Sequence, residues 1–230
     1  MNTEVLRSIE KLERWIHNEK FMGWDPYDLQ TSPLFENVDT SKAAKLSPLF
    51  FILRFFPWNI RSIFKIKKTY NSQAISLFII SYIELYRISK KKKYYSILSQ
   101  LYEILKEQSL KRYTGYHCWG TPFNTFVKNR IYKPTEPGIV NTSLAILALS
   151  KYYTLTGNEE SLHLIKSSLE FVKKMYVEEK NIAFFRYRPS IKELFIINGS
   201  ALVVEAISES IKILPEKMLL EMCEKTLNTI

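Results

Sequence analysis

The chain has 230 residues, of which 46% are hydrophobic and 24% are charged, and its formal net charge is +10. This size and composition allow one sizeable hydrophobic core, so we predict a single globular domain over residues 1–230. The excess of positive charge favours an anionic partner and leaves nucleic acid, a membrane surface and an acidic glycan open.

Cysteine and histidine usage argues against disulfide, redox and metal chemistry. Cys118 and Cys223 are the only cysteines in the sequence. They exclude a disulfide framework and a CxxC pair, and they favour a reducing, cytoplasmic location. His17, His117 and His163 lack the spacing of metal ligands, so we expect no metal and no cofactor.

Targeting and membrane-spanning signals are not found. The amino-terminal segment MNTEVLRSIEKLERW lacks the apolar core of a signal peptide. The most hydrophobic run, residues 46–58, is interrupted by Pro48 and Arg54 and is too short to span a bilayer. No phosphate-binding loop, nucleophile elbow, zinc finger or RNA-binding signature occurs, so we expect no nucleic-acid partner.

Apolar residues recur at helical spacing along most of the chain, which predicts an all-α fold. Inner helices are apolar on nearly every side and need neighbours to cover them, whereas outer helices carry a single apolar stripe. The predicted inner helices span residues 49–56, 73–86, 139–149 and 199–211. The predicted outer helices span residues 5–16, 59–68, 94–108, 161–176 and 216–227. Inner and outer helices therefore alternate.

The links between these helices also alternate. Links from inner to outer helices are short, whereas those from outer to inner helices are mostly long and span residues 20–45, 110–138 and 177–193. In antiparallel hairpins, all links of one direction lie at the same end of the bundle. We therefore expect the long links to gather on one face and to carry the functional residues.

The spacing of the predicted hairpins favours a ring of inner helices surrounded by outer helices. Hairpins begin near residues 73, 139 and 199, which is too far apart for a tetratricopeptide array with its repeat of about 34 residues. The predicted fold is an α/α toroid.

The first long link contains GWDPYD, which allows two compatible interpretations. In the first, Asp25 caps a helix and Asp28 is its reciprocal partner. In the second, Trp24 and Tyr27 stack on sugar rings, and the carboxylates act as an acid or as orienting groups.

The second long link contains YHCWGTPFN. Tyr116 and Trp119 either stack on sugar rings or plug the end of the bundle. His117 is the strongest candidate for proton transfer because the pKa of histidine lies near neutrality, and Tyr116 is the alternative base. Asn124 is a candidate ligand-binding side chain in the same segment.

The third long link contains FFRYRPS. Its alternation predicts a short strand or hairpin with Arg186 and Arg188 on one side and Tyr187 on the other. Arginines bind carboxylates through forked hydrogen bonds, which suits an acidic sugar. A solvated turn is the alternative.

Two further sets of residues have both structural and functional interpretations. Asn141, Thr142, Asn198 and Ser200 lie near the starts of inner helices, where they either cap the helix or face a central funnel. The lysine-rich runs at residues 65–68 and 89–93 are either solvated surface or contacts to an anionic membrane.

Several segments, taken in order, resemble a family of six-hairpin glycosidase-like α/α toroids encoded near polysaccharide-biosynthesis genes. These segments are GWDPYD with the following SPLF, CWGTPFN, EPGIVNTSLAILALSKYYTLTGNEESL, FRYRPS and INGSALVVEA. The resemblance runs from about residue 15 to 210. It implies a carbohydrate-associated protein that acts in, or descends from, the synthesis or modification of an acidic polysaccharide.

The sequence departs from the family's pattern in three ways. The family tends to have an aspartate where this chain has Asn124, and His-Asn where this chain has Ile197 and Asn198, so an acid and a possible base are missing. A full toroid has six hairpins, whereas four inner helices are predicted here. We expect an open ring that is either a truncated or split gene product, or is closed by a partner subunit or by self-association.

Three functional hypotheses follow. The first is a polysaccharide lyase, epimerase or hydrolase, and the second is a non-catalytic glycan-binding or scaffold remnant. The third is a peripheral membrane protein that uses the basic helix predicted at residues 59–68. The candidate catalytic residues are His117, Asp25, Asp28 and Tyr116. The candidate substrate-binding residues are Trp24, Tyr27, Trp119, Asn124, Arg186, Tyr187, Arg188 and Asn198.

Overall fold

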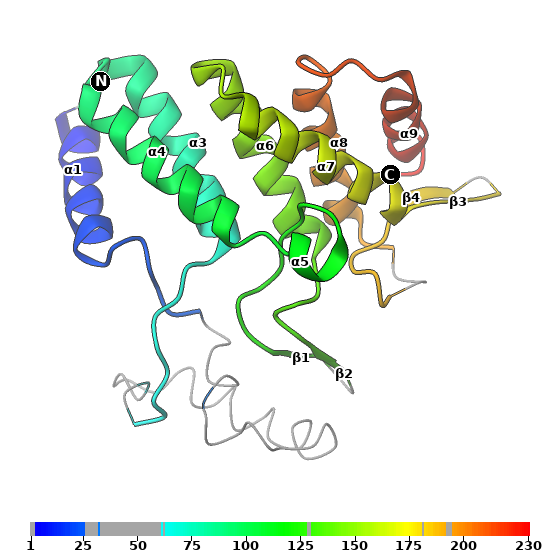
Figure 1. The fold of residues 1–230 in the computed structure, drawn as a ribbon, viewed down its shortest axis with the longest axis horizontal. Helices are drawn as coiled ribbons and strands as arrows, with labels where there is room; N and C mark the ends of the chain where they lie inside the picture. Colours follow the sequence, from blue (N-terminus) through cyan, green and yellow to red (C-terminus); the bar gives the residue numbers. More distant parts are fainter. Residues whose placement is uncertain are drawn as a thin grey trace. The chain divides into compact units, whose positions relative to one another are not determined.

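The computed structural model describes residues 3–25, 32, 61, 63–127, 130–180, 182–191 and 195–230 (Figure 1). The chain divides into two compact units. The first unit comprises Met1–Asn71 and Pro122–Lys133, and the second comprises Ser72–Thr121 and Pro134–Ile230. A single domain over the whole chain stays a prediction.

Three α/α hairpins form the second unit. The inner helices are α3 (Ser72–Ser89), α6 (Ile139–Thr156) and α8 (Ile197–Ser210). The outer helices are α4 (Lys92–Glu107), α7 (Glu159–Met175) and α9 (Lys217–Leu227). Helix α6 packs between α3 and α8, and each inner helix packs against the outer helix that follows it (Figure 1). This arrangement confirms the predicted α/α toroid fold.

Burial explains why the two kinds of helix differ in sequence. On the inner helix α3, Ile75, Ile79 and Ile83 are completely buried, and each contributes about 1.5–3 kcal/mol relative to an exposed side chain. On the outer helix α4, Leu98 and Leu105 are completely buried while the opposite face is exposed. The predicted alternation of inner and outer helices is thus confirmed for α3 to α9.

A short antiparallel hairpin follows α7 and leads to α8. Its strands are β3 (Tyr176–Glu179) and β4 (Ile182–Phe185), and Tyr176 pairs with Phe185. Within FFRYRPS, only Phe184 and Phe185 lie in β4, so the predicted strand is confirmed for these two residues; Arg186 to Ser190 follow the strand as loop and turn. Arg186 comes directly after β4, so the hairpin positions the backbone of Arg186.

The first unit contains α1 (Thr3–Asn18) and a second small hairpin, β1 (Thr125–Val127) with β2 (Arg130–Tyr132). Helix α1 confirms that residues 5–16 are helical, and its outer place in the ring stays a prediction. The predicted inner helix at residues 49–56 lies outside the described residues. No helix in the described ranges is long and apolar enough to cross a bilayer.

The basic helix predicted at residues 59–68 is wrong for the part of this segment that the structure describes. Lys65 has a left-handed backbone with φ of 53°, which ends a right-handed helix at that point. Gly23 and Thr69 then exchange two main-chain hydrogen bonds of 3.1 and 3.0 Å, which hold the chain extended. The lysine-rich run is therefore a turn and an extended strand-like segment.

Candidate functional site: a pocket between two long loops and the end of an outer helix

Two long links of the second unit meet at the start of α6. The main-chain nitrogen of Gly138 donates to the carbonyl oxygen of Trp119 at 2.9 Å, and that of Ile139 donates to the carbonyl oxygen of Tyr187 at 3.1 Å. These two bonds bring the links at 110–138 and 177–193 together at one end of the helical bundle. The prediction that the long links gather is confirmed for these two. The link at 20–45 belongs to the first unit.

Trp119 anchors the first of these links inside the core. Its side chain is completely buried, and Nε1 donates to the carbonyl oxygen of Leu105 at 2.7 Å. Its main-chain nitrogen donates to Oγ1 of Thr142 at 3.1 Å. A fully buried ring cannot stack on a ligand, so the structure supports the plug interpretation of Trp119 and corrects its assignment to sugar binding.

The polar residues near the starts of the inner helices join neighbouring segments instead of capping their own helices. The N-cap positions of α6 and α8 are Gly138 and Ile196, and neither makes a side-chain capping bond. Asn141 donates to Oγ of Ser72 at 3.1 Å and accepts from Gln73 at 3.2 Å, which ties α6 to α3.

Thr142 and Ser200 also join their helices to neighbouring segments. Thr142 binds the main chain of Trp119, and Oγ of Ser200 accepts from the main-chain nitrogen of Phe185 at 3.2 Å. The capping prediction is therefore wrong for these residues. Because buried polar groups need hydrogen-bond partners, these side chains fix the loops against the inner helices.

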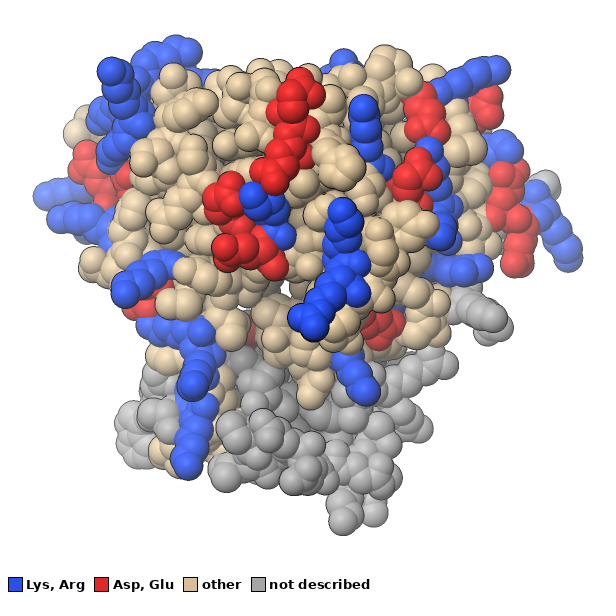
Figure 2. Space-filling view, in the orientation of Figure 1, with Lys and Arg blue, Asp and Glu red and all other residues tan. Residues whose placement is uncertain are grey.

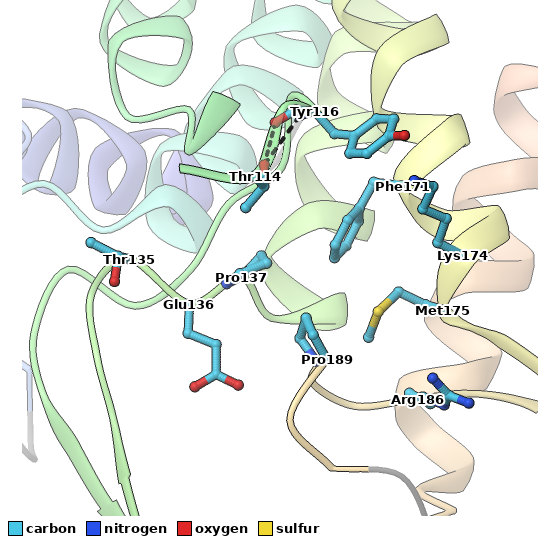
Figure 3. Close-up of a pocket in the computed structure, with 10 residues that line it drawn as sticks. All are labelled: Thr114, Tyr116, Thr135, Glu136, Pro137, Phe171, Lys174, Met175, Arg186 and Pro189. Carbon is cyan, nitrogen blue, oxygen red and sulfur yellow. Dashed lines mark hydrogen bonds between the residues drawn. The ribbon is translucent and has the colours of Figure 1, made fainter. Parts of the chain in front are cut away.

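A pocket of about 440 Å³ lies where these loops meet the end of α7 (Figure 3). It is lined by Thr114, Tyr116, Thr135, Glu136, Pro137, Phe171, Lys174, Met175, Arg186 and Pro189. The lining residues come from both links and from the last turns of α7. Apolar side chains form its centre, and charged side chains stand at its sides (Figure 3).

The pocket combines two aromatic rings, Tyr116 and Phe171, with charges of both signs. Nζ of Lys174 lies 4.5 Å from the centroid of the Tyr116 ring, within the range of a cation–π contact. Glu136 accepts a hydrogen bond from the hydroxyl of Ser190. Figure 3 shows Glu136 and Arg186 on opposite sides of the pocket. A ligand in the pocket therefore meets a carboxylate on one side and a guanidinium on the other.

A main-chain hydrogen bond positions Arg186, whereas one nitrogen of its side chain has no hydrogen-bond partner among the described residues. Its main-chain nitrogen donates to the carbonyl oxygen of Met175 at 2.9 Å. Its Nε is buried, and among the described residues it has no hydrogen-bond partner. A buried donor without a partner costs about 1–3 kcal/mol, so an acceptor that reaches Arg186 would recover this energy.

The sequence predicted two of the charged or aromatic lining residues, Tyr116 and Arg186. It missed Glu136, Phe171 and Lys174. Glu136 directly precedes Pro137 in the last part of a long link, so its position just before an inner helix was the available signal. Lys174 lies in the last turn of α7, where a basic side chain is also expected from the helix dipole alone.

His117 lies outside the residues that line the pocket. Its Nδ1 is 2.8 Å from Oγ of Ser109, and its ring lies 6.3 Å from the ring of His163 on the outer helix α7. Burial, reinforced by the positive charge of Lys111, lowers the pKa of His117 to about 4. His117 therefore contacts Ser109 and the outer helix α7, and its assignment as a base stays a prediction.

The remaining candidates of the second unit are not among the residues that line the pocket. Arg188 is 5% exposed, so its guanidinium belongs to the protein interior. Tyr187 is half-buried, and its ring lies beside Gly199 at the start of α8. Asn198 is exposed in the first turn of the same helix.

The other candidates belong to the first unit. Nε1 of Trp24 donates to the carbonyl oxygen of Ile66 at 3.4 Å, and Nζ of Lys68 lies 4.5 Å from the Trp24 ring. The main-chain oxygen of Asp25 accepts from Arg61 at 3.4 Å. Asn124 is half-buried. Tyr27 and Asp28, with the predicted cap, lie outside the described residues.

Metal binding has no support in the part of the chain that the structure describes. Within those ranges, no group of three or more His, Cys, Asp or Glu side chains could hold a metal ion. The pKa values of the two buried thiols, Cys118 and Cys223, are both raised to about 11 by burial. Both thiols are therefore protonated near neutral pH.

Sequence comparisons and structural comparisons give different results. No protein-family model matches the sequence, and no curated protein matches it significantly. Solved structures of α/α-toroid enzymes do match the fold. Cellobiose 2-epimerase from Bacillus thermoamylovorans is similar with a TM-score of 0.54 and 17% identity, over 71% of this chain and 46% of that chain.

Two more structures extend this similarity. D-mannose isomerase has a TM-score of 0.53 and 13% identity, over 70% of this chain and 40% of that chain. An inactive α-1,6-mannanase from a Salegentibacter species was solved in complex with α-1,6-mannotetrose. It has a TM-score of 0.54 and 14% identity, over 88% of this chain and 57% of that chain. The chain thus spans less than two thirds of each structure. At these identities the similarity shows the fold alone, which is an α/α toroid; three of its hairpins lie in the described part of the second unit.

Proposed function

We propose that the protein binds an acidic saccharide in the pocket between Tyr116, Lys174 and Arg186, as part of the synthesis or modification of a polysaccharide in the cytoplasm. The observation that carries this proposal is the buried Nε of Arg186, which has no hydrogen-bond partner among the described residues. A sugar carboxylate that pairs with the Arg186 guanidinium in the pocket would supply this acceptor once the side chain shifts to expose Nε. Arginine is suited to this role because its planar guanidinium pairs with a carboxylate through two bonds.

The shape and lining of the pocket support a sugar as the ligand. Its volume of about 440 Å³ lies within the range of about 300–1,000 Å³ that small-molecule sites occupy. Tyr116 and Phe171 offer ring surfaces for the apolar faces of a sugar, and Tyr116 adds a hydroxyl. Lys174 and Arg186 place two cations beside these rings, which favours an acidic over a neutral saccharide.

The structural relatives support a carbohydrate as the ligand. The preference for an acidic carbohydrate is inferred from residues of this chain alone. Their names describe epimerisation, isomerisation and hydrolysis of sugars, and one of them was solved with mannotetrose. The acidic preference rests on Lys174 and Arg186. These two side chains are the reason for proposing a uronic-acid type of ligand.

The carboxylate of Glu136 favours a catalytic function, as a second candidate, over simple binding. In a lyase or epimerase, Glu136 would take the proton from the carbon next to the sugar carboxylate, while Arg186 neutralises the charge that develops on that carboxylate. Hydrolysis usually needs two carboxyl groups across the bond. Among the described lining residues, Glu136 is the single carboxylate, so proton abstraction fits the pocket better than hydrolysis.

Isothermal titration calorimetry with matched oligosaccharides tests the binding proposal. The protein is expected to bind a uronic-acid oligosaccharide at least tenfold more tightly than its neutral counterpart, and Arg186→Gln is expected to remove this preference. Arg112→Gln is the matched control because Arg112 is exposed on α5 (Lys111–Thr114) and does not line the pocket. Equal affinity for both oligosaccharides, or equal loss in both variants, would contradict the proposal. Turnover of the bound oligosaccharide, lost in Glu136→Gln, would establish the catalytic version.

A further inference from the structure

The turn between α3 and α4 is the most basic stretch of the second unit. Residues 90–93 are four consecutive lysines, and all of them are exposed. Arg87 and Ile88 precede this run at the end of α3, and Ile88 is 67% exposed. Figure 2 shows basic side chains over this end of the molecule. The turn thus combines concentrated positive charge with a protruding apolar side chain.

Nearby carboxylates do not neutralise this charge. Glu84 pairs with Arg87 at 2.9 Å. Glu209 on α8 pairs with Lys212 at 2.6 Å, and this bond, aided by more distant cations including Arg87, lowers the pKa of Glu209. Among the described residues, Lys90, Lys91 and Lys92 have no carboxylate within salt-bridge distance. The positive charge of these three lysines is therefore available to a partner.

The lysines are unfavourable for the helix that they begin. The first turn of α4 holds Lys92 and Lys93 and no acidic residue, and Lys91 at the N-cap makes no side-chain capping bond. Because the N-terminus of a helix carries positive partial charge, cations at this place weaken the helix by a few tenths of a kcal/mol each. Local stability therefore does not explain the run.

The turn lies at the opposite end of α3 from the pocket loops. Ser72, at the start of α3, donates to the carbonyl oxygen of Gly120 at 3.2 Å, so this end adjoins the loop that leads to the pocket. The 18 residues of α3 separate the two ends by about 27 Å, at 1.5 Å per residue (Figure 1). A partner bound at the turn would leave the pocket open.

We propose that the α3–α4 turn docks the protein onto an anionic membrane surface. Lys90 to Lys93 lie at the level of the lipid head groups, and Ile88 inserts into the interfacial region. Tyr95, which is 42% exposed on α4, lies at the edge of the same surface. These two apolar or aromatic side chains favour a membrane over nucleic acid, because a duplex offers phosphates but no apolar layer. The proposal does not depend on what the pocket binds.

Vesicle co-sedimentation of the full chain tests this proposal. The protein is expected to bind vesicles of phosphatidylcholine mixed with phosphatidylglycerol and not vesicles of phosphatidylcholine alone, with binding that weakens as salt rises. Because each lysine near an anionic surface contributes roughly fivefold, the double variant Lys91→Gln/Lys92→Gln should bind about thirtyfold more weakly. Ile88→Ser should bind roughly fivefold more weakly at unchanged charge.

A second double variant controls for net charge. Lys111→Gln/Lys180→Gln removes the same charge from exposed positions outside the turn, so it should bind vesicles as the unmodified chain does. Circular dichroism verifies that all variants keep their helices. Equal binding to neutral vesicles, or equal weakening in both double variants, would overturn the proposal. Turn-dependent binding to duplex DNA without binding to vesicles would also overturn it, since the partner would then be a soluble polyanion.

Discussion

The backbone of Gly120 passes so close to that of Glu136 that a β-carbon at position 120 would lie 2.4 Å from the Glu136 carbonyl oxygen. Position 120 therefore requires glycine because two loop segments approach each other closely there, and not because of an unusual backbone angle. Trp119, the neighbour of Gly120, is anchored in the core, so the contact fixes the backbone that carries Glu136. The carboxylate of the pocket is thus positioned through Gly120.

Gly120→Ala is expected to lower the free energy of unfolding by about 1–3 kcal/mol, because the backbone oxygen of Glu136 must move to admit the methyl group. Urea denaturation measures this loss. Gly199→Ala is the matched control, since its β-carbon would meet the Tyr187 ring at an ordinary 3.5 Å inside a helix. That variant should be neutral or slightly stabilised. If both variants unfold at the same urea concentration, the two loop strands are not in close contact.

Trp119→Phe is expected to cost about 2–4 kcal/mol of stability. The smaller ring leaves part of a fully buried site empty, and the carbonyl oxygen of Leu105 loses the donor that now lies 2.7 Å away. Thermal unfolding followed by circular dichroism checks this expectation. A variant with unchanged stability but weaker saccharide binding would restore Trp119 to the ligand site.

His117 makes stability depend on pH in a defined range. Its pKa is about 4 in the folded protein and near 6.5 in the unfolded chain, so only the unfolded chain takes up a proton between these values. Above pH 6.5, His117 therefore does not reduce the free energy of unfolding. As the pH drops from 6.5 towards 4, its protonation in the unfolded chain reduces the free energy of unfolding more and more. With allowance for partial exposure, this group lowers the free energy of unfolding by about 1 kcal/mol at pH 5 relative to pH 7.

The variant His117→Gln isolates this contribution. Glutamine does not titrate, so the difference in unfolding free energy between pH 7 and pH 5 should shrink by about 1 kcal/mol. Urea denaturation of both proteins at the two pH values gives the comparison. An identical pH dependence in the two proteins would mean that His117 is protonated equally in the folded and unfolded states.

The layering of the helices could be predicted because it depends on local composition. Ile75 and Ile79 belong to a helix that is apolar on nearly every side, and such a helix needs neighbours that cover most of its surface. The meeting of two long links at one end followed from hairpin geometry. Arg186 was found because it lies in one of those links.

The roles of single polar residues could not be predicted, because their partners come from distant parts of the chain. Asn141 was expected to cap its own helix, yet it binds Ser72 and Gln73 on a helix almost 70 residues earlier. Likewise, sequence spacing does not say whether a loop residue faces a pocket or an outer helix. Tyr116 lines the pocket, whereas its neighbour His117 contacts Ser109 and the outer helix α7.

A crystal structure of the protein with a bound uronic-acid oligosaccharide tests the central claim most directly. The predicted result is a sugar carboxylate within hydrogen-bond distance of the Arg186 guanidinium, with a sugar ring beside Tyr116 and Lys174. A saccharide bound elsewhere while the pocket stays empty, or one that occupies the pocket with its carboxylate turned away from Arg186, would contradict it.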